Sequence, residues 1–248
     1  MQWRVIKLET RSAASNMAVD NAIMDGIKAG TSGPTMRFYR WMPSAVSIGR
    51  FQSMEEEVNV ARCKELGVSY VRRITGGGAV YHDSEGEITY SVIAPEEEFP
   101  KNIIESYRLI CGWVISGLAS LGISAEFAPI NDIIVKGKKI SGNAQARKEG
   151  VLLQHGTVLY STNLKRMFSL LKVSSEKISD KMIKNAEDRV TRVTDHADTT
   201  LNGLYDALLA GFVEGKDYEF GALDHDEAAK AEDLAGKVYA ADSWNFSR

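Results

Sequence analysis

The chain has 248 residues, of which 44% are hydrophobic and 25% are charged, and its formal net charge is −3. A chain of this length buries a core without disulfides or metal ions, and the composition is that of an ordinary globular protein. The slightly negative charge argues against a nucleic-acid binder, whose surface is usually basic. The sequence has neither a membrane-spanning apolar run nor the apolar region of a signal peptide, so we expect a cytoplasmic protein that does not bind membranes.

The first two thirds of the chain are expected to be rich in strands. Ser15 or Asn16 is expected to cap the first helix, which ends near Gly30, and Gly67 to close the second. Apolar residues alternate with polar ones in the strands and recur on one face of the helices. In chain order, we expect a strand over 3–8, a helix from 17 to 30, strands over 36–41 and 45–50, a helix over 58–66, a strand ending at 71, a strand over 88–93 and a helix over 103–121.

The last part of the chain is expected to be mainly helical. A hairpin with Gly137 in its turn and a strand over 151–160 come first. Candidate helices then cover 164–172, 176–186, 199–214 and 225–239. The strands follow one another too closely for regular βαβ units, which favours a mixed, largely antiparallel sheet flanked by helices. We therefore predict one α/β domain over residues 1–248.

A run of three glycines is the most informative feature. Residues 72–83 read Arg-Arg-Ile-Thr-Gly-Gly-Gly-Ala-Val-Tyr-His-Asp and lie between two expected strands. Glycines lacking a Cβ let backbone amides approach a ligand, and the flanking arginines suit a carboxylate or phosphate. A flexible surface turn is the alternative, although three glycines beside paired arginines are unusual in a turn.

Residues 131–144 form a second candidate site. Three lysines, Lys136, Lys138 and Lys139, are followed by Ser141-Gly142-Asn143. A solvated hairpin tip accounts for Lys136 and Lys138. If Ile140 points into the core, alternation directs Lys139 to the opposite face, where its amine would suit phosphate oxygens.

A third patch is Gln154-His155-Gly156-Thr157. A histidine inside a strand is more often a hydrogen-bonded structural residue than a catalyst, and Gly156 can mark a bulge. The Walker A, dinucleotide-binding and GxSxG patterns are all missing. Arginine, glycine loop and lysine together suit a site that brings two anions together.

These motifs resemble the lipoate–protein ligase family. The resemblance covers essentially the whole chain in the right order, and the three central motifs together are specific to that family. It is carried by residues 72–83, 139–144 and 155–157, and also by Asn16 to Asp20, Ser47 to Gln52, Arg189 to Thr194 and Ser243 to Asn245. The resemblance implies the biotin/lipoyl ligase catalytic fold, which is related to the class II synthetase core.

Two departures from the family pattern matter. Family members often have Gly-Asn shortly after the His-Asp pair, whereas this chain has Ser84-Glu85-Gly86-Glu87, which puts a polar role for Glu87 in doubt. Bacterial ligases of this type usually continue into a C-terminal accessory domain, and this chain stops after the Trp-Asn that closes the catalytic domain. We therefore expect a lone catalytic domain or a separate accessory protein.

The resemblance implies an ATP-dependent, AMP-forming ligase. Lipoate and ATP would give lipoyl-AMP with Mg²⁺ as the expected metal, and a lysine of a carrier domain would then take the lipoyl group. Lys139 is the expected catalytic residue, and Arg73, Val80, His155, Gly156 and Thr157 would form the lipoate pocket. The expected ATP and lipoyl-adenylate site consists of Arg73, Gly76, Gly77, Gly78, Ala79, Val80, Tyr81, His82, Asp83, Lys139, Ser141, Gly142, Asn143 and Ala144. No metal ligands can be named.

The implied partners are lipoyl-carrier domains, namely the E2 component of 2-oxoacid dehydrogenases and the H protein of glycine cleavage. The nearest alternative is an octanoyl or lipoyl transferase on the same fold, which carries the acyl group on a cysteine. Neither Cys63 nor Cys111 lies in the motifs, and Cys111 is expected to be a core thiol, so the ligase is preferred. A biotin ligase and a non-catalytic adenylate-binding module are further alternatives.

Overall fold

A large sheet crosses the middle of the molecule in the computed structural model, which describes residues 1–172 and 188–248. Its strands are β1 (Trp3–Arg11), β2 (Thr35–Trp41), β6 (Glu87–Pro95), β7 (Glu126–Ala128), β8 (Asp132–Val135), β9 (Lys138–Lys148), β10 (Val151–Leu159) and β11 (Tyr218–Gly221). They lie in the order β11-β1-β2-β6-β10-β9-β8-β7. β1 pairs parallel with β11 and β2, and the other pairings are antiparallel. The predicted mixed, largely antiparallel sheet is confirmed.

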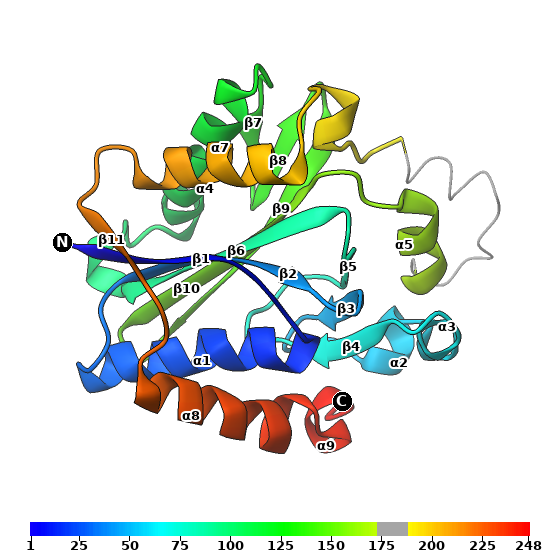
Figure 1. Ribbon diagram of the computed structural model, residues 1–248. Helices are drawn as coiled ribbons and strands as arrows, with labels where there is room; N and C mark the ends of the chain where they lie inside the picture. Colours follow the sequence, from blue (N-terminus) through cyan, green and yellow to red (C-terminus); the bar gives the residue numbers. More distant parts are fainter. Residues whose placement is uncertain (173–187) are drawn as a thin grey trace.

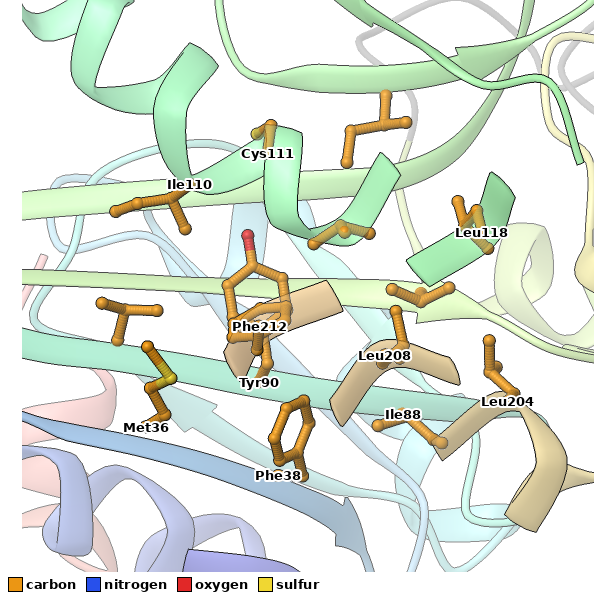
Figure 2. Packing of buried hydrophobic residues seen from close by; sticks show 14 of the residues in the cluster. Met36, Phe38, Ile88, Tyr90, Ile110, Cys111, Leu118, Leu204, Leu208 and Phe212 are labelled. Atoms are coloured by element: carbon orange, nitrogen blue, oxygen red, sulfur yellow. The ribbon is translucent and has the colours of Figure 1, made fainter. Parts of the chain in front are cut away.

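Helices cover both faces of this sheet (Figure 1). On one face lie α1 (Ala13–Ala29) and α8 (His225–Leu234), and on the other lie α4 (Ile103–Ser120) and α7 (Leu201–Val213). The core beneath α4 and α7 is aromatic: the ring of Phe212 meets those of Phe38 and Tyr90 edge to face, at 5.1 and 4.9 Å (Figure 2). Cys111 is fully buried in the same core, as expected.

A second, small sheet carries the glycine-rich connection. Its order is β4 (Ser69–Arg72), β3 (Ala45–Ile48) and β5 (Val80–His82). The connection between β4 and β5, residues 73–79, is called the glycine loop below. Three short helices, α2 (Met54–Glu57), α3 (Val60–Glu65) and α5 (Leu164–Leu170), supply the apolar side chains behind this sheet. The strand expected before the three glycines is β4, whereas the strand that follows them is β5, which was not predicted, and the expected strand over 88–93 is β6.

The remaining described elements are short. They are η1 (Glu96–Glu98), η2 (Val193–Asp195), η3 (Ala235–Tyr239) and α9 (Asp242–Asn245). The expected helix over 225–239 is thus α8 followed by η3, a π-helical turn. The helix expected over 176–186 lies outside the described residues. Within 1–172 and 188–248, no helix combines the length and apolar character needed to cross a bilayer.

Several expected boundaries are wrong for local reasons. Ser12, not Ser15 or Asn16, caps α1, because the Ser12 hydroxyl accepts from the Ser15 amide while the Asn16 side chain donates to the carbonyl of Arg40. The helix expected over 58–66 begins only at Val60, where Asn59 caps α3. The last third of the chain is not purely helical, because exposed β11 adds an edge strand that no burial pattern signals.

Candidate functional site

The sequence motifs meet at one cavity of about 120 Å³ between the glycine loop, β9 and β10. Its wall combines apolar groups with imidazole, amine, guanidinium and hydroxyl groups. The predicted site residues that line it are Arg73, Gly77, Gly78, Ala79, Val80, His82, Lys139, Gly142, Asn143, Ala144, His155, Gly156 and Thr157. Segments more than 80 residues apart in the chain therefore contribute to one wall.

Arg73 holds the glycine loop in shape. Its Nη2 donates to the carbonyl oxygens of Gly76 and Gly78, both at 2.8 Å. Gly77 has a φ of 97°, which a residue with a Cβ rarely adopts. Its carbonyl oxygen would lie 2.1 Å from a Cβ added to Gly49, so Gly49 must also lack a side chain. In the described ranges the amides of the three loop glycines have no acceptor, and those of Gly77 and Gly78, which line the cavity, are available to a ligand.

Arg72 does not face the cavity, although the sequence grouped it with Arg73 as an anion ligand. Its guanidinium is fully buried and donates to the carbonyl oxygens of Trp244 and Asn245 and to those of residues 49, 50 and 52. These five backbone acceptors hold the guanidinium away from the cavity, which Arg72 does not line. The role of Arg72 is to fasten the C-terminal segment to β4.

Lys139 reaches the cavity because β9 contains a bulge. The register between β8 and β9 shifts at Ile140, and Lys139 pairs with Ile134. Paired residues share a face, so the bulge puts Lys139 on the face of Asp132, two residues before Ile134. The Lys139 Nζ lies 2.7 Å from the Asp132 Oδ1. Ile140 is fully buried in the core, and Lys139 lines the cavity, which is the arrangement that alternation predicted.

The same bulge displaces Ser141 from the cavity. Ser141 pairs with buried Ile133 and is itself fully buried, whereas Gly142 pairs with Asp132 and lines the cavity. Ser141, which was expected at the ligand site, therefore faces the core, because the extra residue interrupts alternation along β9. Gly142 leaves room for the lysine, since an added Cβ would lie 2.6 Å from both Cε and Nζ of Lys139.

Gly156 does not mark a bulge. The register of β10 with β6 and with β9 runs without a shift through this position. A Cβ at Gly156 would lie 1.9 Å from the Asn143 Oδ1 and 2.7 Å from a ring carbon of Tyr90. The Tyr90 hydroxyl donates to that Asn143 oxygen at 2.6 Å. Glycine is thus needed so that the Asn143 side chain can cross over β10 to reach its partner.

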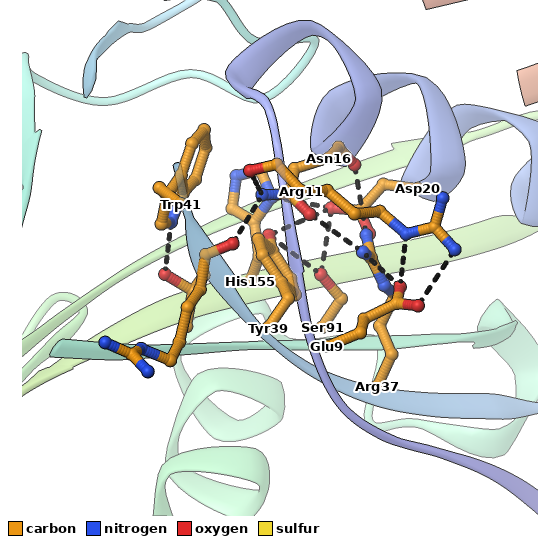
Figure 3. Close-up of polar contacts among 11 residues, drawn as sticks. Glu9, Arg11, Asn16, Asp20, Arg37, Tyr39, Trp41, Ser91 and His155 are labelled. Atoms are coloured by element: carbon orange, nitrogen blue, oxygen red, sulfur yellow. Dashed lines mark hydrogen bonds and ion pairs between the residues drawn. The ribbon is translucent and has the colours of Figure 1, made fainter. Parts of the chain in front are cut away.

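His155 belongs to a buried polar network beneath the cavity (Figure 3). Its Nδ1 lies 3.2 Å from the Asp20 Oδ2, and the Asp20 Oδ1 accepts from the Arg37 Nη1 at 2.8 Å. Burial is the largest influence on the pKa of His155 and lowers it, although Asp20 opposes this effect. Burial also acts to raise the pKa of Asp20, but Arg37 and His155 outweigh it, and the net shift is downward. The carboxylate therefore stays ionised, with His155 as a neutral partner.

His82 is fixed in a similar way on the opposite wall. Its Nε2 lies 2.8 Å from the Ser47 Oγ, and its Nδ1 lies 2.7 Å from the Glu87 Oε1. The imidazole also stacks on Trp41, with ring centroids 3.8 Å apart. The Glu87 carboxylate has the polar role that the altered spacing after Asp83 put in doubt.

Four predicted site residues do not line the cavity. Gly76 contributes a carbonyl oxygen to Arg73, and Tyr81 is buried in the core of the small sheet. Asp83 accepts from the amides of Glu85 and Asn163, and Ser141 faces the core. Sequence reasoning gave no role to the other lining residues, which are Met17, Tyr39, Trp41, Ser47, Thr89 and Asn131. Met17 and Ser47 lie in segments that carried the family resemblance, which was the available signal.

Neither cysteine is placed to carry an acyl group. Cys63 and Cys111 are both fully buried and do not line the cavity. Burial raises the pKa of Cys63 to about 11 and that of Cys111 to about 12, so both thiols are protonated near neutral pH. In the described part of the chain, no group of three or more His, Cys, Asp or Glu side chains is arranged to hold a metal ion.

Comparison with known proteins shows the family of this chain. Residues 12–213 match the model of the lipoyl protein ligase A/B catalytic domain. The chain is 36% identical to octanoyltransferase LipM of Brevibacillus brevis, over 100% of this chain and 99% of the relative. It is 32% identical to octanoyltransferase LipM of Staphylococcus aureus, over 99% of each. A solved structure from Thermoplasma acidophilum is described as part of a bi-partite lipoate protein ligase studied with its E2 lipoyl domain. It superposes on this chain with a TM-score of 0.90 at 35% identity, and the match covers 99% of this chain and 96% of that one.

These relatives correct the expected activity. The curated relatives are named octanoyltransferases, which contradicts the expectation of an ATP-dependent, AMP-forming lipoate ligase and of ATP and Mg²⁺ as its cofactors. The preference for the ligase relied on the lack of a motif cysteine. That lack argues against a thiol carrier but not against acyl transfer itself. What the ligase and the transferase share is protein modification by lipoylation, and the chain belongs to the lipoyl protein ligase A/B catalytic domain family.

Proposed function

We propose that this chain transfers an octanoyl- or lipoyl-type acyl group from an activated donor, such as a thioester, to a lysine of a lipoyl-carrier domain. The observation that supports this most directly is the meeting of free glycine-loop amides, the Lys139 amine and apolar wall groups at one cavity. Acyl transfer needs these elements together: a slot for the chain, and donors near the carbonyl oxygen that becomes negatively charged.

The proposed reaction takes place at the acyl carbonyl. The neutral amine of the carrier lysine attacks it, and negative charge develops on the carbonyl oxygen. The C–S bond then breaks, the amide remains, and the donor leaves as a thiol with the proton that the amine releases. Lys139, as an ammonium beside Asp132, and the amides of the glycine loop would stabilise that charge. Val80 and Ala144 would contact the aliphatic part of the acyl group.

The carrier partners follow from the family. The Thermoplasma study includes an E2 lipoyl domain, and we propose that E2-type domains and the glycine cleavage H protein accept the acyl group. That neighbour is also described as bi-partite, so we propose that a separate accessory polypeptide supports transfer. Transfer by this chain alone, at a rate that no second polypeptide raises, would contradict the accessory role.

Intact-protein mass spectrometry tests the function. The chain is mixed with an octanoylated acyl carrier protein and an unmodified lipoyl domain, without ATP, and the octanoylated domain is the expected product. Lys139→Ala should lower the rate by about 10²- to 10³-fold. Lys138→Ala, next to it and exposed at the start of β9, should leave the rate unchanged.

Two outcomes would contradict this proposal. One is modification of the domain only when a free fatty acid and ATP replace the thioester donor. The other is tight binding of acyl compounds with no transfer, which is the behaviour of a non-catalytic module. The double variant Cys63→Ala, Cys111→Ala should keep its activity, because both thiols are buried outside the cavity.

A further inference from the structure

Arg73 is a buried cation whose charge is not balanced by direct contact with a carboxylate. The residue is 4% exposed, and burial lowers its pKa to about 10. Among the described residues, no Asp or Glu oxygen lies within ion-pair distance of its guanidinium. A buried, unpaired charge is unfavourable, so its other contacts must compensate for lost hydration.

One compensating chain runs through Thr75 and His155. The Arg73 Nε donates to the Thr75 Oγ1 at 3.0 Å, which lies 2.7 Å from the His155 Nε2. The His155 Nδ1 lies 3.2 Å from the Asp20 Oδ2. A guanidinium can only donate, an ionised carboxylate can only accept, and the neutral His155 ring has one donor and one acceptor nitrogen, so the direction of each hydrogen bond is fixed. The Thr75 hydroxyl must donate to Nε2, and the His155 Nδ1–H must donate to Asp20.

A second chain of the same composition reaches Arg73 from the other side. The Arg73 Nη1 donates to the Ser47 Oγ at 3.3 Å, and that oxygen lies 2.8 Å from the His82 Nε2. The His82 Nδ1 lies 2.7 Å from the Oε1 of Glu87, which is fully buried. Both chains therefore read arginine, hydroxyl, imidazole, carboxylate, and both place the imidazole proton on Nδ1.

We propose that Ser47, Thr75, His82 and His155 are positioning residues that fix Arg73, and through it the glycine loop, for the acyl transfer proposed above. We call each of these arginine–hydroxyl–imidazole–carboxylate series a relay. In each relay the negative charge of Asp20 or Glu87 stabilises the guanidinium through the imidazole and hydroxyl that lie between them. Arg73 can then hold the carbonyls of Gly76 and Gly78 while the loop amides stay free for the reacting carbonyl oxygen. A carboxylate in direct contact with Arg73 would compete with those carbonyls for the same donors.

Ser47, His82 and Glu87 could also be read as a nucleophile, base and acid, because their spacings suit such a triad. The observations favour positioning. Ser47 is 2% exposed, and its oxygen already accepts from Arg73. Thr75 holds the equivalent position in the other relay, between Arg73 and an imidazole, and it does not line the cavity. Acylation of Ser47 is therefore an outcome that the experiment must detect.

The first test does not depend on activity. Long-range ¹H–¹⁵N NMR of the imidazole nitrogens, assigned with His82→Gln and His155→Gln variants, reports the tautomer of each ring. Both rings should have a proton on Nδ1, and His155, whose pKa is lowered by burial, should be neutral at pH 7. A neutral ring with its proton on Nε2 in either relay, or an imidazolium at His155, would overturn the proposal even if the chain proves to be no transferase.

The second test uses the transfer assay. Thr75→Val and Ser47→Ala should each lower kcat by about 10-fold or more with little change in KM for the donor, and Thr75→Ser should restore the rate. Their effects should be less than multiplicative in the double variant, because both act through Arg73. Ser44→Ala, a buried hydroxyl bonded to Ser84 instead, is the matched control and should keep wild-type kinetics.

Two kinetic results would refute the positioning role. Wild-type kcat in both Thr75→Val and Ser47→Ala would show that the relays do not support the loop. An acyl ester on Ser47, found by peptide mass spectrometry after reaction with the donor alone, would make Ser47 a catalytic residue instead. A wild-type chain that transfers no acyl group would reject the proposed function and leave the tautomer test to judge the relays.

Discussion

At the scale of single residues, the cavity depends on side chains that are absent as much as on those present. Gly142, Gly156 and Gly49 each adjoin an atom that a Cβ would displace. The atoms differ in how far they can move: the end of Lys139 is flexible, whereas the carbonyl oxygen facing Gly49 belongs to the backbone. Substitution at Gly142 should therefore affect chemistry, and substitution at Gly49 should affect folding.

Gly142→Ala separates these effects. The new Cβ would displace the Lys139 amine from its place beside Asp132 while the sheet persists. Transfer should fall toward the rate of Lys139→Ala, and the melting temperature should change by only a few degrees. Parallel rate and thermal-melting measurements check this. A large loss of stability with unchanged rate in the remaining folded protein would contradict the prediction.

His155 should make stability depend on pH. Its pKa is lowered in the folded state from an ordinary value of 6.5, so the unfolded chain binds the proton more readily. This contribution to stability is present above pH 6.5 and is lost as the pH falls through the folded-state pKa. Asp20 opposes the shift, and Arg73 and His82 add to it.

Urea unfolding between pH 8 and pH 5 measures this effect. His155→Gln should flatten the decline in the free energy of unfolding over that range. His225→Gln, at an exposed position, should keep the wild-type slope. An equal slope in all three proteins would exclude His155 as the source.

At the scale of elements, α4 and α7 cross where each has a glycine. A Cβ at Gly117 would lie 2.7 Å from the Ala207 carbonyl oxygen, and one at Gly211 would lie 2.3 Å from that of Trp113. The helices are therefore in backbone contact, and their approach seats the Phe212 ring against Tyr90 beneath the cavity wall.

Gly211→Ala should force these helices apart. The conflict is with backbone that cannot rotate away, so the free energy of unfolding should fall by about 1–3 kcal/mol. Gly112→Ala in α4, where a Cβ meets nothing within 4 Å, should leave stability unchanged or raise it. Denaturant unfolding of both variants gives the comparison, and equal stability would show that the helices readjust.

The sequence predicted elements where local chemistry decides the conformation. The hairpin at Gly137 is an example: Lys136 and Gly137 both have positive φ at the tight turn. β11 was missed because its four residues are exposed and its strand partner, β1, lies some 215 residues earlier. Thr89 and Trp41 were missed as cavity residues because their contact, a hydrogen bond of 2.8 Å, depends on the pairing of distant strands.

At the scale of the whole molecule, the C-terminal segment is tied to the strand that leads into the glycine loop. The Asn245 Oδ1 accepts from the Arg72 amide at 2.8 Å, and the Trp244 Nε1 donates to the Arg72 carbonyl at 2.8 Å. The sequence could not assign Arg72 to this role, because its partners in the C-terminal segment lie more than 170 residues away.

Asn245→Ala tests this connection. The buried Arg72 amide would lose its acceptor, which should cost about 1–3 kcal/mol of unfolding free energy. Hydrogen exchange of the β4 amides should quicken, while Ser247→Ala at the exposed end should leave both measurements unchanged. Unaltered exchange in Asn245→Ala would show that the segment does not brace β4.

Because of the extra residue at Ile140, the length of the β8–β9 hairpin decides whether the Lys139 charge lies in the cavity. Deleting Lys138 with the turn kept would let Lys139 pair with Val135, which would restore plain alternation and rotate the lysine toward the hydrophobic interior, although no reactive group had been substituted. Relatives whose hairpin is one residue shorter and has no bulge should therefore have an apolar side chain three residues before the position of Gly142. Alignments of this family that ignore the offset will compare a cavity residue with a core residue.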